Sequence, residues 1–172
     1  GLIGRFESKK GQMLALEAIK YVTTDFLLLL VGEETLDKKS NYLSELKHYI
    51  REQKLEDKVQ FLNFTTSPAD VFNAIDWTLM ASYSETFGMV TLESMACGTP
   101  VIGSNTGGTK SLLEEGRLGV LFDPKNAQDL AEKINLALSE KKVIEKTKLI
   151  SFIQTYDFNQ VCSMVEKLLT SK

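Results

Sequence analysis

Short apolar runs alternate with longer stretches of helical periodicity along the whole chain. The run at 26–31 is continuously apolar, as expected for a strand buried on both faces of a parallel sheet. Further along, Tyr42, Leu46 and Ile50 recur at the spacing of one helical face. Because parallel neighbouring strands need helical crossovers, this alternation predicts an α/β fold built on a parallel sheet.

The apolar pattern predicts six strands, at 2–3, 26–31, 59–62, 77–81, 100–103 and 119–122. It predicts helices at 12–22, 38–53, 68–75, 89–97, 110–114 and 127–138. Ser67 is expected to cap the helix that begins at Pro68. Residues 141–172 are expected to form C-terminal helices, one of them at 159–169. We find no repeat or internal boundary, so residues 1–172 are expected to form one Rossmann-like, doubly wound domain with helices on both faces of about six strands.

Composition narrows the possible functions of the domain. With 43% hydrophobic and 25% charged residues, the 172-residue chain is typical of a globular protein. A net charge of −3 without a basic stripe argues against nucleic-acid binding. Cys97 and Cys162 lack metal-ligand spacing and are expected to be reduced thiols, which favours a cytoplasmic location. His48 is the only histidine, which excludes a multi-histidine metal site, and it is expected at the surface.

The loops that follow the strands should carry the functional site, because ligands of doubly wound sheets bind beyond the carboxyl ends of the strands. In the segment SETFGMVTLESMACGTPVIGSNTGG (84–108), Gly88 precedes a predicted helix whose first amides could bind a phosphate. Glu85 and Glu93 bracket this junction and could hold the hydroxyls of a ribose or another sugar. The same spacing recurs at Glu132 and Glu140 on a predicted surface helix, so the context and not the spacing predicts a nucleotide-sugar site.

Several motifs occur together in one order along the chain. They are GRFESKKG (4–11), the strand end at 31–32, VQFLNF (59–64) followed by AIDWTLMAS (74–82), ETFGMVTLESMACGTPVI (85–102), the glycine pair at 107–108 and GVLFDP (119–124). From about 4 to 138 the chain resembles the C-terminal half of a family 4 (group 1) retaining glycosyltransferase of the GT-B fold. Three positions depart from the family pattern: Ser111 replaces a glutamate, Ala81 a proline and Asn63 a glycine. The departures affect the expected base pocket and sugar specificity.

The resemblance implies roles for individual residues. Arg5 and Lys10 would grip the donor diphosphate, and Glu85 would contact the donor sugar and support charge at its anomeric centre. Glu93 would hold the ribose hydroxyls. The remaining donor-binding set is Leu62, Tyr83, Phe87 and Gly88, together with Met89, Val90 and Thr91, whose backbone amides would neutralise the diphosphate. The side chains of Phe87 and Met89 are more commonly core residues, and Tyr83 would either stack on the base or pack.

The implied activity is retaining transfer of a hexose or N-acetylhexosamine, with UDP favoured as the nucleotide, and no metal cofactor is expected. A glycan or lipid-linked acceptor would be held by an N-terminal domain, in bacterial surface polysaccharide synthesis (lipopolysaccharide O-antigen or capsule). Because the chain begins part-way through a strand without methionine, we expect a fragment that binds nucleotide but does not transfer sugar. The full-length enzyme is expected to have at most peripheral contact with the membrane.

Other functions share part of this pattern. A nucleotide-sugar epimerase or a phosphorylase of the same fold would share the nucleotide-binding half, and a non-catalytic nucleotide-binding module is also compatible with a chain this short. The segment GSNTGGTKS (103–111) approaches a phosphate-binding P-loop, but Thr109 intervenes between the second glycine and the lysine. A Rossmann dehydrogenase is disfavoured, because no G-x-G-x-x-G follows the first strand.

Overall fold

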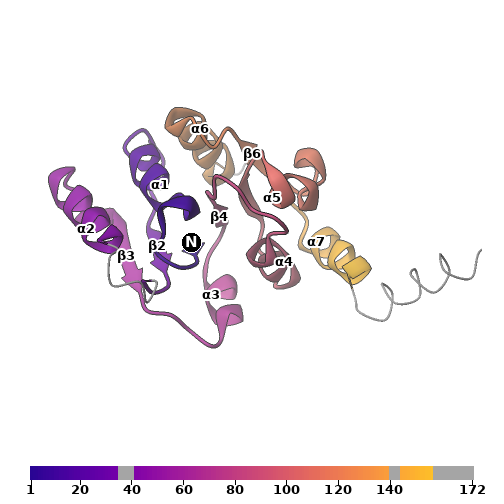
Figure 1. Ribbon diagram of the computed structural model, residues 1–172. Coiled ribbons are helices and arrows are strands. Elements are labelled where there is room, and N and C mark those ends of the chain that lie inside the picture. Colours follow the sequence, from indigo (N-terminus) through magenta and orange to yellow (C-terminus); the bar gives the residue numbers. More distant parts are fainter. Residues whose placement is uncertain (35–40, 140–143, 157–172) are drawn as a thin grey trace, which may run out of the picture.

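The computed structural model describes residues 1–34, 41–139 and 144–156, in which strands and helices alternate (Figure 1). The helix predicted at 159–169 and the thiol of Cys162 lie outside the described residues. No helix in these described ranges is long and apolar enough to cross a membrane.

Two parallel three-stranded sheets lie side by side at the centre of the molecule. The first has the order β1 (Leu2–Ile3), β2 (Leu28–Val31) and β3 (Val59–Leu62), and the second has β4 (Thr78–Met80), β5 (Val101–Ser104) and β6 (Gly119–Phe122). The Leu79 N–H donates to the Gly1 carbonyl at 2.7 Å and joins β4 to β1. The strand order therefore runs 3-2-1-4-5-6 and changes direction between β1 and β4, which confirms the predicted doubly wound architecture.

Helices cover both sides of these sheets. They are α1 (Gln12–Ile19), α2 (Tyr42–Glu52), α3 (Pro68–Ala74), α4 (Met89–Ala96), α5 (Gly107–Leu112), α6 (Ala127–Leu138) and α7 (Lys146–Ile153), with 3-10 turns η1 (Ser8–Lys10), η2 (Glu56–Lys58), η3 (Glu114–Gly116) and η4 (Gln154–Tyr156). On one side α1 packs between α2 and α6, and on the other α4 packs between α3 and α7 (Figure 1).

Alternate residues of the central strands pack into two different hydrophobic cores. Leu79 and Ile102 join the larger core, which includes residues of α1 and α6. Their neighbours Met80 and Val101 join a smaller core with Leu149 of α7. Because successive side chains of a strand point to opposite faces, this division buries both faces of the sheet. The apolar residues of these two central strands are therefore buried on both sides of the sheet.

The structure moves several predicted boundaries. β2 begins at Leu28 rather than Phe26, and the preceding Leu27 is 55% exposed. α5 begins at Gly107 and not at Lys110, so the glycine pair forms the first turn of the helix. Ser67 occupies the position before α3, but its hydroxyl makes no capping hydrogen bond, so the helix start relies on Pro68.

A buried polar network ties α4 to the strands beneath it. The Ser94 hydroxyl, fully buried, contacts the Thr78 hydroxyl at 2.7 Å and donates to the Thr99 carbonyl at 2.9 Å. We expect Ser94→Ala to lower the free energy of unfolding by about 1–3 kcal/mol, because it leaves buried partners unsatisfied. Urea denaturation measures this change. Ser151→Ala, at an exposed position of α7, is the control and should change stability by less than about 0.5 kcal/mol. An equal change in both variants would contradict a role for the network.

Candidate functional site

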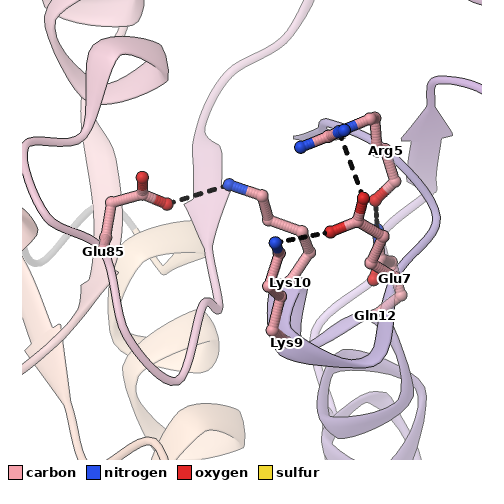
Figure 2. A network of polar contacts seen from close by, with 6 residues as sticks. All are labelled: Arg5, Glu7, Lys9, Lys10, Gln12 and Glu85. Carbon is pink, nitrogen blue, oxygen red and sulfur yellow. Dashed lines mark hydrogen bonds and ion pairs between the residues drawn. The ribbon is translucent and has the colours of Figure 1, made fainter. Parts of the chain in front are cut away.

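An ion pair joins two distant sequence motifs, 4–11 and 85–102, at the carboxyl edge of the sheets. The Lys10 ammonium lies 3.0 Å from a Glu85 carboxylate oxygen, although the residues are 75 positions apart in the chain (Figure 2). Their side chains are 23% and 18% exposed. The pair lies where the loops after β1 and β4 meet, so two predicted site residues come together at the change in strand order.

The Lys10 side of this pair is held by close backbone packing. Lys10 ends the η1 turn, and Gly11 follows with φ of +73°. A Cβ at Gly11 would overlap the Ala81 carbonyl oxygen and lie 2.7 Å from its carbon. The Tyr83 N–H also donates to the Lys9 carbonyl at 3.0 Å. The turn therefore lies directly against the chain leaving β4, and only glycine fits at this crossing.

The Glu85 side of the pair is held by the glycine pair at the start of α5. The Gly108 N–H donates to the Glu85 carbonyl at 2.8 Å. A Cβ at Gly107 would overlap the Glu85 carbonyl oxygen, and one at Gly108 would overlap that of Phe87. The two glycines thus pack against the backbone of the loop that presents Glu85. The sequence alone could not tell whether these glycines are needed for this packing or for contact with a ligand.

Arg5 lies on the same turn with its own carboxylate partner. Its Nε lies 3.2 Å from Glu7, whose other oxygen lies 2.9 Å from the Lys9 ammonium (Figure 2). The Arg5 carbonyl accepts a 2.8 Å hydrogen bond from the amide of Gln12, a fully buried residue. The sequence pattern did not point to Gln12, whose one signal is a polar residue at the first position of a largely apolar helix.

The start of α4 offers backbone donors beside Glu85. Gly88 precedes the helix with φ of +93°, and a Cβ there would lie 3.6 Å from the Glu85 Cγ. The Thr91 N–H donates to the Gly88 carbonyl at 2.9 Å. Within the described residues the amides of Met89 and Val90 have no acceptor, so they remain the donors that a phosphate could use.

The other predicted residues lie around this centre. Leu62 ends β3 and lines a cavity of about 390 Å³ with side chains from the loops after β1 and β2. Tyr83, Phe87 and Met89 are 45%, 46% and 57% exposed, so the expectation that Phe87 and Met89 pack in the core is wrong. Burial of the Tyr83 phenol, with a smaller effect of Glu17, raises its pKa above the ordinary value. Tyr83 therefore stays a hydroxyl donor at neutral pH.

Glu93 takes no part in the Lys10–Glu85 ion pair. It is a half-buried residue of α4 and lines a groove of about 430 Å³ with residues of the α7 and η4 segment. The groove is otherwise largely apolar, with Leu92, Ile150 and Ile153 among its lining residues. The structure thus brings Arg5, Lys10 and Glu85 to one edge, and Glu93 lines the groove between α4 and the α7 and η4 segment.

Metal ligation finds no support among the residues described. In those ranges, no group of three or more His, Cys, Asp or Glu side chains could hold a metal ion. His48 is exposed on α2 and lies 3.2 Å from Glu52, as predicted for a surface histidine. Cys97 is a half-buried free thiol. Metal independence of the reaction remains a prediction.

Comparisons with known proteins match most of the chain. The sequence profile of the family described as "Glycosyl transferases group 1" matches residues 1–151. The D-inositol 3-phosphate glycosyltransferase of Pseudarthrobacter chlorophenolicus is 34% identical over 136 residues, which cover 75% of this chain and 31% of that protein. The chain therefore spans about a third of this curated relative.

Solved structures give the same result. Anabaena Alr3699/HepE in complex with UDP is 28% identical, with a TM-score of 0.89 over 100% of this chain and 48% of that chain. The same protein has been solved with UDP-glucose. The C-terminal domain of the Francisella tularensis group 1 protein LpcC, 24% identical, has the same fold, with a TM-score of 0.78 over 92% of this chain and 85% of that domain. The chain accordingly belongs to the group 1 glycosyltransferases and has the fold of the C-terminal domain of a GT-B enzyme.

Proposed function

We propose that this chain is the donor-binding domain of a retaining hexosyltransferase that uses UDP-hexose or UDP-N-acetylhexosamine. The observation that carries the proposal is the Lys10–Glu85 pair beside the start of α4. A cation that could bind a diphosphate, a carboxylate that could accept from sugar hydroxyls and two available amides lie close together there, which supports the proposal.

Each group has a role in the transfer. The bond between the anomeric carbon and the β-phosphate oxygen breaks, and its electron pair stays on the phosphate. Arg5, Lys10 and the α4 amides stabilise the charge that develops there. Glu85 holds the sugar and Glu93 the ribose hydroxyls. The acceptor hydroxyl oxygen forms the new bond on the same face, and its proton passes to the departing diphosphate.

The relatives support the choice of donor more than that of acceptor. A protein 28% identical to this chain was solved with UDP and with UDP-glucose, which favours a uridine donor. The curated relative named for transfer to D-inositol 3-phosphate supports sugar transfer and points to an acceptor other than a glycan. We retain a glycan or lipid-linked acceptor, surface polysaccharide synthesis and a cytoplasmic location as proposals. The acceptor would be held by an N-terminal domain.

Calorimetric titration of the chain with UDP, GDP and ADP tests this function. We expect UDP to bind and Glu93→Ala to weaken its binding at least about tenfold, because the ribose loses charge-assisted hydrogen bonds. The control is Glu132→Ala, which removes an exposed carboxylate of α6 and should leave binding unchanged. Binding to none of the three nucleotides would overturn the proposal. Unchanged UDP binding in Glu93→Ala, with the fold intact by circular dichroism, would refute the ribose role.

A further inference from the structure

The Lys10–Glu85 pair has a consequence for which ligand the site prefers. We propose that Glu85 is a specificity-determining residue that competes with the diphosphate for Lys10, so that the site favours the sugar-bearing donor over the sugar-free nucleoside diphosphate. The inference rests on the proposed function, because it assumes that Lys10 binds a diphosphate and that Glu85 faces the sugar.

The pair is built to make this competition effective. Both side chains are largely shielded from solvent, at 23% and 18% exposure, so the attraction is less screened than between freely exposed groups. Arg5 differs, because its side chain is 59% exposed beside Glu7. Breaking this exposed ion pair to reach a phosphate costs less free energy than breaking the Lys10–Glu85 pair. Among these cations of the turn, Lys10 is the one whose carboxylate partner comes from the loop after β4.

Fixed backbones confine the exchange to side chains. Gly11 packs against Ala81 on the Lys10 side, and Gly107 and Gly108 pack against the Glu85 loop on the other. Neither backbone can move away without losing these contacts. A diphosphate that engages Lys10 therefore leaves Glu85 in place, with its negative charge close to the phosphates.

The sugar changes this balance. The Lys10 ammonium has three N–H donors but a single positive charge, so it cannot neutralise a diphosphate and Glu85 together. A donor sugar supplies hydroxyl groups that donate to the Glu85 oxygens and replace the lost partner. A sugar-free diphosphate supplies none. After transfer, recapture of Lys10 by Glu85 would therefore favour release of the diphosphate product.

Titrations of wild-type chain and Glu85→Gln with UDP and with UDP-glucose test the proposal. We expect Glu85→Gln to tighten UDP binding about 3- to 10-fold, since tenfold corresponds to about 1.4 kcal/mol. UDP-glucose should gain no affinity in the same variant, because it loses the carboxylate that accepts from its hydroxyls. Glu132→Gln, a distant exposed carboxylate with the same change in charge, should leave both affinities unchanged.

A Lys10→Met background separates competition from simple repulsion. If Glu85 acts by holding Lys10, Glu85→Gln should raise UDP affinity less in the Lys10→Met background than in the wild-type chain. The fold-increase in affinity should be at least about threefold smaller. Equal gains in both backgrounds, or an equal gain for UDP and UDP-glucose, would overturn the proposal while leaving the donor-binding function intact. Absence of UDP binding by the parent chain would instead remove the proposed function, and this inference with it.

Discussion

Lys10→Met is expected to weaken UDP binding about 10- to 100-fold and to leave uridine binding nearly unchanged. Lys10 ends a turn at the carboxyl edge of the sheets, with its ammonium 3.0 Å from Glu85 in the loop that leads to α4. Loss of a charge-assisted hydrogen bond of about 1.5–3 kcal/mol accounts for that range. Uridine carries no phosphate, so its affinity should not change when the Lys10 ammonium is removed. Calorimetry with both ligands measures the difference.

The neighbouring Lys9 provides a matched control for this variant. Its ammonium is 63% exposed and pairs with Glu7 rather than with Glu85. Lys9→Met makes the same chemical change one residue earlier and should weaken UDP binding less than about threefold, as expected for an exposed charge. If Lys10→Met weakened uridine and UDP binding to the same extent, Lys10 would act on folding and not on phosphate.

Gly11→Ala is expected to lower the free energy of unfolding by about 2–5 kcal/mol. One contribution is the left-handed conformation of Gly11, at φ of +73°, which costs a residue with a Cβ about 1–2 kcal/mol. The other is overlap of the new Cβ with the Ala81 carbonyl, and overpacking of this kind costs about 1–3 kcal/mol. Because the turn must shift away from β4, the variant should also bind UDP more weakly.

Gly116 separates these two contributions. Its φ is +96°, but the nearest atom to a Cβ there is a side-chain carbon of Leu121 at 3.7 Å, which is ordinary contact. Gly116→Ala should therefore lose only the conformational contribution, about 1–2 kcal/mol, and keep UDP binding. Thermal or urea unfolding of both variants provides the comparison. Equal destabilisation would show that the approach of Gly11 to Ala81 has no energetic importance.

Local sequence was sufficient to predict the elements and their class. Within the described residues, the apolar runs predicted the six strands observed, although β3 carries an exposed polar residue, Gln60. Helix positions followed from periodicity. The ends of some elements were predicted wrongly: the helix α5 begins at Gly107 and the strand β2 begins at Leu28. Element ends depend on contacts such as Gly108 with Glu85, which periodicity does not contain.

The motif order likewise identified the family, which the family profile and the relatives confirm. It could not predict the exposure of Phe87 and Met89, because both residue types occur more often in cores. It also missed Gln12, whose importance rests on a single hydrogen bond to the Arg5 carbonyl.

The sequence by itself thus determined the alternating α/β pattern, the family and the residues that carry charge at the strand ends. Only the tertiary structure decided that β1 lies beside β4, which brings Lys10 within 3.0 Å of Glu85. It also gave Gly11, Gly107 and Gly108 their role as points of close backbone approach. The reason is physical: hydrophobic periodicity reports which face of an element is buried, whereas partners 75 residues apart are chosen by how the elements pack.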